Sequence, residues 1–333
     1  MLNLVKNVPI PTAGVALGLA ALGNLLQPYG EWLHTLCGVL SAALVLLLLA
    51  RIVFFSGVVL EDFRNPIFAS VSGTFFMALM QLATYLAPLA YVPALVLWWV
   101  AVAAHAVLIV WFTALFIARF KLDDVYPTYF ICYVGIIVGA VTSPAFGAQR
   151  FGYALFSFGF ACYMALLVLV TLRYAKLGVA EPARPLFCIY AAPMSLSLAG
   201  YLTVEPHPSV AFACVLAVLA QALFLMVLLR MPSLLRLKFY PSYAAMTFPF
   251  VITATALGKV LALLGAQGVA VPGALRAVLV AETVFAALMV AYVLVRYLVY
   301  FAGLWREGRA AARTGCTTAV DAAPASAPLG TNR

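Results

Sequence analysis

The stretch Pro241-Ser-Tyr-Ala-Ala-Met-Thr-Phe-Pro-Phe250 sets the pattern on which this chain is built, since it opens on one proline and carries a second, Pro249, eight residues later. A helix accepts proline in its first turn, whereas an interior proline removes a backbone hydrogen bond and bends the helix. The bulky Phe248 therefore lies beside a predicted bend, next to the hydroxyl of Thr247. Irregular backbone in a membrane is tolerated only where protein or a water-filled cavity satisfies the freed groups. This stretch is the first candidate for a functional centre.

The composition assigns the chain to the membrane proteins. Of its 333 residues, 66% are hydrophobic and 9% are charged, and the mean hydropathy is +1.11. A soluble domain carries about 25% charged residues, so this chain has too few polar side chains to cover a water-exposed surface. We predict an all-α integral membrane protein that crosses the bilayer many times.

A bilayer is spanned by about 20 apolar residues, and ten segments of the chain meet that rule. They are residues 9–26, 33–57, 66–88, 93–118, 127–147, 151–175, 185–203, 208–231, 241–265 and 273–301. We predict three parts: an N-terminus at 1–8, a membrane domain at 9–303, and a tail at 304–333. The tail lacks apolar periodicity, so we expect it to be disordered.

The distribution of Lys and Arg predicts the orientation of the ten segments, because cytoplasmic loops carry the excess of positive charge. Sixteen of the 19 Lys and Arg fall on the side of both termini, and three, Arg150, Lys259 and Arg276, fall on the other. We expect both termini to be cytoplasmic, in an inner membrane. The net charge of +9 is then a topology signal, and no nucleic-acid partner is expected.

An internal repeat is the most informative feature of the sequence. Every odd-numbered segment opens on a proline, and a helix-weakening residue follows seven or eight positions later. The opening prolines are Pro11, Pro66, Pro127, Pro185 and Pro241, and the later residues are Gly18, Gly73, Gly135, Pro193 and Pro249. The spacings of 55, 61, 58 and 56 residues each correspond to one helical hairpin. Five hairpins of one design predict a quasi-fivefold arrangement.

The odd and even segments also differ in their side chains. The odd segments hold 15 Ser or Thr in 106 residues, and the even segments hold 8 in 129. A water-filled path needs hydroxyls and exposed carbonyls, whereas lipid-facing helices can be uniformly apolar. We predict an inner ring of five odd helices and an outer ring of five even helices. The alternative is that Gly, Pro, Ser and Thr mark tight helix packing.

Motifs for catalysis or metal binding are missing from the sequence. No HExxH, GxSxG or Walker A motif occurs, and the six cysteines stand singly, without metal-ligand spacing. His105, inside the fourth segment, is expected to be a packed neutral imidazole. We therefore predict no enzyme, no cofactor and no metal.

The two clear cases of a charge inside a predicted membrane segment are Lys259 on the ninth and Glu282 on the tenth. A central charge costs about 2.5–3.5 kcal/mol on insertion scales, and a hairpin would bring these two to similar depth. We predict an ion pair with a structural role, the alternative being a substrate or coupling-ion site. The odd segments hold no acidic residue, which favours anions over cations as the permeating species.

Two short stretches resemble a known family. Val8-Pro-Ile-Pro-Thr-Ala-Gly-Val-Ala-Leu-Gly-Leu-Ala-Ala-Leu22 is similar to the first helix of the tellurite-resistance/dicarboxylate transporter family, and Thr247-Phe-Pro249 is similar to that family's gate motif. The family includes TehA-like bacterial proteins, fungal malate and sulfite exporters, and the slow anion channels of plant guard cells. One departure is Asn65-Pro66, where several relatives carry His-Pro.

The resemblance implies ten helices in five hairpins, a homotrimer with one pore in each protomer, and a Phe248 ring that plugs the pore. It also implies that the kinks of the odd helices line the pore. The residues expected at these kinks are Gly18, Gly73, Gly135, Pro193, Thr247 and Pro249. The alternative for Phe248 is that it is an aromatic side chain of the packed core, beside a bend, with no role in gating.

The leading hypothesis is an anion channel or transporter that passes small inorganic or dicarboxylate anions. The alternative is a secondary exporter of C4-dicarboxylates, sulfite or tellurite-type oxyanions, coupled to protons through His105 or Glu282. A membrane enzyme acting on lipids or prenyl substrates would need clustered acids or histidines at one membrane face, and the loops lack them. A purely structural protein would leave the predicted inner ring unexplained.

Overall fold

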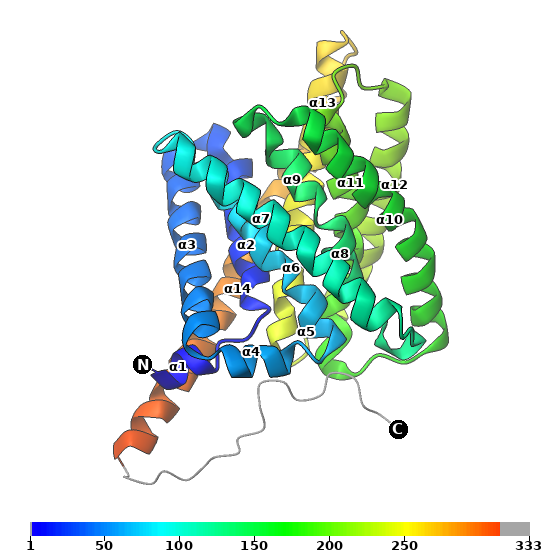
Figure 1. The fold of residues 1–333 in the computed structure, drawn as a ribbon. Coiled ribbons are helices and arrows are strands. Elements are labelled where there is room, and N and C mark those ends of the chain that lie inside the picture. The colour runs from blue at the N-terminus through cyan, green and yellow to red at the C-terminus, as the bar shows by residue number, and fades with distance from the viewer. Residues whose placement is uncertain (1, 314–333) are drawn as a thin grey trace.

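The computed structural model describes residues 2–313, and within that range it contains helices and no strand. The helices form one bundle, with the connections at its two ends (Figure 1). Among these residues, eight helices are long and apolar enough to cross a membrane, and a ninth span results if the pair Thr128–Val134 and Ile137–Phe146, bent by 48°, counts as one. The chain is a multi-pass membrane protein, as its composition predicts.

Helix is present in each of the ten predicted segments. The proline-opened segments contain α2 (Thr12–Leu26), α5 (Pro66–Val71) with α6 (Gly73–Leu86), α8 (Thr128–Val134) with α9 (Ile137–Thr142), the 3₁₀ helix η5 (Glu181–Ala191) with α11 (Ala192–Val204), and the 3₁₀ helix η6 (Pro241–Met246) with α13 (Phe248–Ala266). The segments between them contain α3 (Glu31–Phe54), α7 (Tyr91–Phe112) with the π-helical turn η2 (Thr113–Ile117), α10 (Gln149–Lys176), α12 (Val210–Leu234) and α14 (Gly273–Arg313). The 15 residues of α2 are too few to count as a span by length alone.

Five short helices complete the described chain: α1 (Leu2–Lys6), η1 (Gln27–Tyr29), α4 (Ser56–Asp62), η3 (Leu122–Asp124) and η4 (Ser143–Phe146). They lie at the ends of the bundle (Figure 1). We call the end that holds α1 and α4 the terminal end, because the end of α14 also lies there, and we call the other the opposite end. The structure thus places both termini of the described chain at one end of the bundle.

Burial alternates along the sequence. In the apolar cores of Pro66–Leu86, Glu181–Val204 and Pro241–Ala266, between 61% and 83% of residues are buried, compared with 28–39% in the five intervening spans. In α2, every residue from Thr12 to Gly23 is buried. The proline-opened spans therefore form the interior of the bundle, and the intervening helices carry most of the apolar surface that faces outward.

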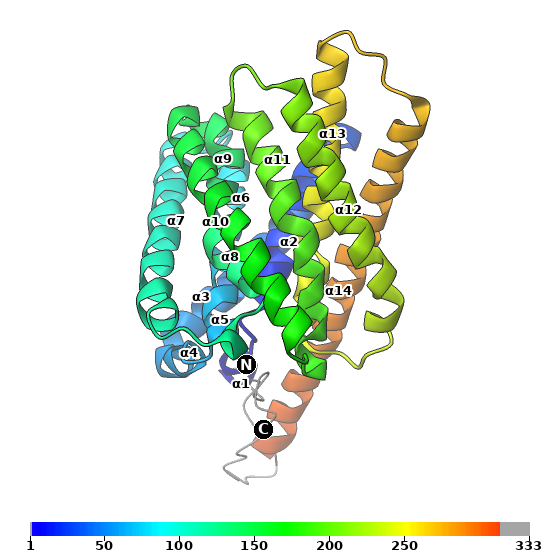
Figure 2. The same ribbon diagram turned by 90° about the vertical axis from the view of Figure 1, so that its right-hand side faces the viewer.

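The buried spans contact one another in a closed cycle. Helix α2 packs against α6, α6 against α9, α9 against α11, α11 against α13, and α13 against α2. Each outer helix covers part of this cycle; α10, for example, packs on α8, α9 and α11. In Figure 2, α2 lies in the middle of the bundle, with α7 and α14 at its sides.

Four of the buried spans are interrupted near their midpoints. The interruption falls at Ser72 between α5 and α6, at Gly135 and Ile136 between α8 and α9, after Ala191 where η5 passes into α11, and at Thr247 between η6 and α13. Pro193 and Pro249 occupy the first turns of the helices that follow, where the missing N–H has no intrahelical partner to lose. Pro249 is thus a helix-starting residue, and the predicted interior bend is a break at Thr247.

A buried ion pair ties α1 and α4 to the bundle at the terminal end. The Arg51 guanidinium on α3 donates to Asp62 Oδ2 at 2.6 Å and, through Nε, to the carbonyl of Lys6 at 3.0 Å. Both partner side chains are at least 88% buried, with exposed fractions of 6% and 12%. This network fixes the chain at the entry to α2.

The last helix is longer than predicted. The sequence places the start of a disordered tail at residue 304, whereas α14 continues to Arg313. Beyond the apolar stretch the helix is extended by residues with high helix propensity, and the Arg309 guanidinium lies 4.7 Å from the ring centre of Trp305. The rest of the predicted tail, 314–333, lies outside the described residues.

Candidate functional site

A cavity of about 120 Å³ lies at the centre of the bundle, and residues of all five buried spans line it. The spans contribute Leu17 from α2, Phe68 from α5 with Met77 from α6, Val134 from α8, Leu196 from α11, and Phe248 from α13. Helices that are far apart in sequence are thus brought together around one space. The outer helices contribute no lining residue to this cavity within the described chain.

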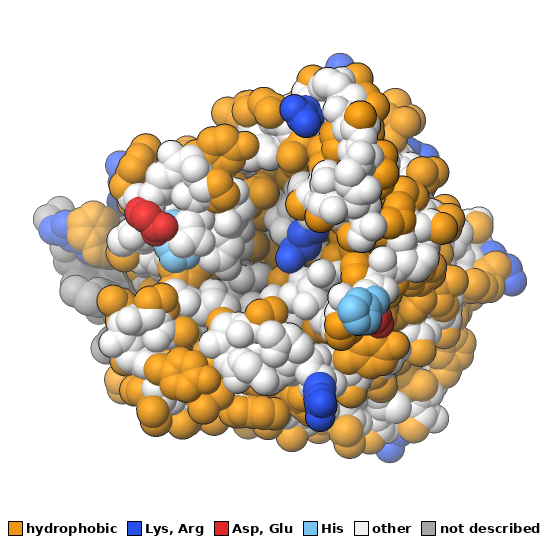
Figure 3. Space-filling model, turned by 90° about the horizontal axis from the view of Figure 1, so that it is seen from above, with side chains coloured by type: hydrophobic (Ala, Val, Ile, Leu, Met, Phe, Trp, Pro, Cys, Tyr) orange, Lys and Arg blue, Asp and Glu red, His pale blue; other side chains and the backbone are white. Residues whose placement is uncertain are grey.

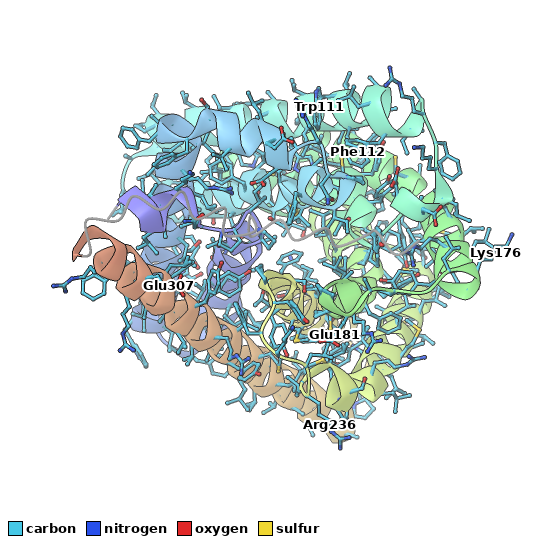
Figure 4. The ribbon with its side chains drawn as sticks, turned by 90° about the horizontal axis from the view of Figure 1, so that it is seen from below. Trp111, Phe112, Lys176, Glu181, Arg236 and Glu307 are labelled. Atoms are coloured by element: carbon cyan, nitrogen blue, oxygen red, sulfur yellow. The ribbon has the colours of Figure 1, made fainter. Side chains whose placement is uncertain are left out.

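The cavity wall is overwhelmingly apolar. Its polar side chains are Thr74, Ser242 and Tyr240, and it has no charged lining residue among those described. Tyr240 lies with Pro182 at the edge nearest the terminal end, where its hydroxyl donates to Glu181 Oε1 at 2.8 Å. Viewed from the terminal end, Glu181 lies closer to the centre than Lys176 and Arg236, which lie at the rim (Figure 4).

Phe248 is the first residue of α13, and its buried side chain lines the cavity with Pro249. The preceding residue holds this position in place. Thr247 Oγ1 donates to the carbonyl of Gly14 on α2 at 3.0 Å and to that of Ala244 at 2.7 Å. The break in the span is therefore stabilised by a side chain that supplies part of the hydrogen bonding that the backbone loses.

Gly18 explains how the break fits against α2. A Cβ at this position would lie 2.6 Å from Thr247 Cβ and 3.1 Å from the backbone nitrogen of Phe248. Any larger residue would push the start of α13 away from α2. Because Gly18 has no side chain, Thr247 and Phe248 can pack directly against α2, and we call this contact the Gly18 seat. Helix α2 itself is continuous through this residue.

The structure divides the predicted lining residues into two groups. Gly135, Pro193, Phe248 and Pro249 line the cavity. Gly18, Gly73 and Thr247 do not; they lie where helices or helix segments meet. Gly73 begins α6, and its added Cβ would lie 3.3 Å from Ile131 of α8.

His105 of α7 reaches the break between α8 and α9. The side chain is fully buried, and its Nε2 donates to the Cys132 carbonyl at 2.8 Å, while Nδ1 has no partner among the described residues. The Cys132 carbonyl accepts this bond one turn before the 48° bend. A Cβ on Gly135 would lie 3.1 Å from His105 Cε1. The isolated histidine of the sequence is thus a buried group that supports a bend next to the cavity.

Hydroxyl groups link neighbouring buried spans. Ser70 of α5 donates to Thr128 of α8 at 2.8 Å, and the hydroxyls of Ser195 of α11 and Thr253 of α13 are hydrogen-bonded at 3.1 Å. Ser242 of η6 donates to the Pro182 carbonyl of η5. The enrichment of Ser and Thr in the odd segments therefore reflects packing between buried spans as well as proximity to the cavity. Sequence reasoning missed these individual bonds.

The predicted ion pair between Lys259 and Glu282 is wrong. No ion pair joins Glu282 to Lys259 among the described residues, and the buried Glu282 carboxyl interacts with Gln221 of α12 instead. A Cβ on Gly258 would lie 3.7 Å from Leu279 Cδ1. In an antiparallel pair this contact sets Glu282 level with Thr255, about one turn from Lys259.

A polar cluster that sequence reasoning missed lies toward the opposite end. Asn24 of α2 donates to Gln81 Oε1 of α6 at 2.7 Å and accepts from His34 Nε2 of α3 at 3.1 Å. The His34 ring stacks on Tyr85, with ring centres 3.9 Å apart. The sequence signal that could have indicated this cluster is the single amide side chain in each of two odd segments, Asn24 and Gln81.

Residues 2–313 hold no group of three or more His, Cys, Asp or Glu side chains that could bind a metal ion.

Comparison with known proteins assigns the family. No curated protein matches the chain. The model of the SLAC1 family, described as voltage-dependent anion channel, matches residues 7–298 and so covers most of the chain. The resemblance noted in the sequence is confirmed: the chain belongs to the SLAC1 family of voltage-dependent anion channels.

Proposed function

We propose that this protein passes small anions along the axis enclosed by its five buried spans, and that the Phe248 ring occludes the path. The observation that carries the proposal is the cavity to which all five buried spans contribute and which Phe248 lines. The closed cycle of contacts among these spans supports a quasi-fivefold inner ring surrounded by an outer ring.

Anions are favoured by the charges around the path. The lining residues include no carboxylate, and carboxylate rings are the usual device of cation channels. Helices also begin at the breaks beside the cavity, among them α6 at Gly73 and α13 at Phe248. A helix start carries a partial positive charge from its free N–H groups, so the middle of the path suits a passing anion.

Occlusion by Phe248 would act through size and dewetting. The ring adds to a wall that is already apolar, and a hydrophobic constriction excludes water and ions without binding them. An anion would cross only when the ring moves. The Thr247 break and the Gly18 seat would determine how readily it does so.

The test is anion flux through the purified protein in liposomes, with Phe248→Ala as the open form. Nitrate, chloride, sulfite and malate are compared with potassium. We expect the variant to carry at least one of these anions faster than potassium, with current proportional to the driving force. Potassium flux equal to anion flux would contradict the proposal, as would a variant without flux.

A secondary exporter of C4-dicarboxylates, sulfite or tellurite-type oxyanions is the second candidate. It is favoured by two buried titratable side chains, Glu282 and His105, the latter with an Nδ1 atom that has no hydrogen-bond partner in the described chain. Neither residue lines the cavity. An exporter predicts saturable transport that depends on a pH gradient and is lost in Glu282→Gln, whereas a channel predicts that Glu282→Gln leaves conduction intact.

We also propose the arrangement in the membrane. The concentration of Lys and Arg on the terminal side supports cytoplasmic termini in an inner membrane. A homotrimer, with one path in each protomer, is proposed from the family assignment. Cross-linking of the reconstituted protein, followed by mass determination, tests that stoichiometry.

A further inference from the structure

Lys259 is the one charge within the odd segments of the sequence, and the structure leaves it without the carboxylate partner that its sequence context suggests. Its place on α13 follows from that of Phe248. Eleven residues separate the two, which is about three helical turns, so their side chains share one face to within about 20° and stand about 16 Å apart along the axis.

Burial indicates which way this face points. Helix α13 packs on α2, α11, α12 and α14, so its outward side is covered. Thr255 and Lys259 are nevertheless half-buried, while Ala256 and Val260 beside them are buried. Because Phe248 on the same face lines the central cavity, the partly open positions Thr255 and Lys259 face the axis of the bundle.

The hydrogen bonds between spans define the depth of Lys259. The Ser195–Thr253 contact aligns α11 with α13, which sets Lys259 level with Tyr201, one turn before α11 ends at Val204. Lys259 therefore lies at the opposite end of the bundle, across Phe248 from the apolar cavity. Seen from this end, the surface is hollowed near its middle, and a Lys or Arg side chain lies beside the hollow (Figure 3).

No described carboxylate of this end is paired with Lys259. Glu31 accepts from Gln27 and Glu205 accepts from the backbone of His207, while the buried Glu282 forms no ion pair within the described chain. No ion pair joins Lys259 to a carboxylate among the side chains that the structure describes. An ammonium group that faces a recess without a counter-charge attracts anions, since low-dielectric walls focus its field.

We propose that Lys259 forms an anion-binding site at the opposite-end mouth of the central path, for small inorganic anions such as nitrate, chloride or bromide. The site rests on the proposed function in that the bound anion is the one that enters the path. Thr255 lies one turn deeper on the same face, and its hydroxyl donates to the Val251 carbonyl at 2.9 Å, so Lys259 is the group that supplies the charge at this mouth. The site concentrates anions ahead of Phe248.

The first test measures the half-saturating nitrate concentration for flux in the Phe248→Ala background. Adding Lys259→Gln is expected to raise that concentration by about threefold to tenfold, with maximal flux within about twofold, because the site loads the path and does not gate it. Lys259→Arg keeps the charge and is expected to restore the parent value. The matched control is Arg276→Gln, which removes an exposed cation at the same end on outer helix α14.

An unchanged half-saturating concentration in Lys259→Gln, equal to that of Arg276→Gln, would overturn the site while leaving the proposed function in place. A lysine that only reaches toward the membrane surface gives this result.

The second test needs no flux. In crystals of the wild-type chain soaked in bromide, we expect an anomalous peak within hydrogen-bond distance of Lys259 Nζ and its loss in Lys259→Gln. A peak absent from the wild type, or retained in Lys259→Gln, would overturn the site. Failure of Phe248→Ala to conduct would instead count against the proposed function, and the bromide peak would still decide whether Lys259 binds an anion.

Discussion

The two ends of the bundle differ in chemistry although the same five spans build both. Toward the terminal end, those spans enclose a cavity with an apolar wall formed by residues such as Leu17, Phe68 and Leu196. Toward the opposite end they carry the Asn24–Gln81 hydrogen bond and the unpaired Lys259. Phe248 stands between the two regions. Under the proposed function, the barrier at the centre would consist of a change from a polar to an apolar environment as well as the Phe248 ring.

The largest effect is expected from removing the ring that separates the two regions. Phe248→Ala should raise anion flux by about tenfold or more, since each 1.4 kcal/mol of lost barrier corresponds to a factor of ten. The matched control is Phe250→Ala, because Phe250 packs outward against Phe224 and Phe285, with ring centres 5.9 and 5.0 Å away.

Phe250→Ala should lower stability by about 3–5 kcal/mol, as expected for a buried ring, without raising flux. Flux in liposomes and thermal unfolding in detergent distinguish the two variants. Equal flux in both would show that Phe248 does not separate the two regions.

The next effect concerns the seat of that ring. In Gly18→Ala the added Cβ would lie 2.6 Å from Thr247 Cβ, so the start of α13 must shift. Such overpacking costs about 1–3 kcal/mol, and anion flux should change with it because Phe248 follows Thr247 directly. Gly265→Ala, with nothing within 4 Å, is the control and should be neutral or stabilising. Equal melting temperatures for the two variants would contradict the close approach.

A smaller effect is expected in the polar region. Gln81→Leu removes the acceptor of the Asn24 amide and should lower stability by about 1 kcal/mol, the net contribution of one such bond. Gln27→Leu provides the comparison, because its bond to Glu31 is exposed and its loss should cost less than about 0.5 kcal/mol. Thermal unfolding of the two variants measures the difference. A larger loss in Gln27→Leu would argue against a structural role for the cluster.

The smallest effect is expected from a polar substitution in the apolar wall of the cavity. Met77→Gln introduces an amide of similar length into the cavity wall, where it would favour water and raise anion flux by about twofold to threefold, or ~0.5 kcal/mol of barrier. Met80→Gln, on the same helix but fully buried away from the cavity, should only destabilise the protein. If Met77→Gln left flux unchanged while remaining folded, the apolar wall would not contribute to the barrier.

Much of the architecture could be predicted from the sequence because its causes are local. Runs of about 20 apolar residues define spans, and the prolines of the repeat mark where buried spans begin and break. Pro193 and Pro249 show this well, since a proline has no N–H to donate and restricts the helix that precedes it. The tail boundary was missed because α14 continues on helix propensity after its apolar stretch ends.

What the tertiary structure alone decided concerns contacts between spans. Gly18 was expected to lie at a kink and instead lies in a continuous helix against Thr247, and Lys259 was expected to pair with Glu282 but forms no ion pair in the described chain. The sequence by itself determined which segments are buried and, to within a few residues, where four of the five break, because those properties depend on hydropathy and on local backbone chemistry. The register of one helix on its neighbour depends on side chains from both, and it decided which polar groups meet and which remain free.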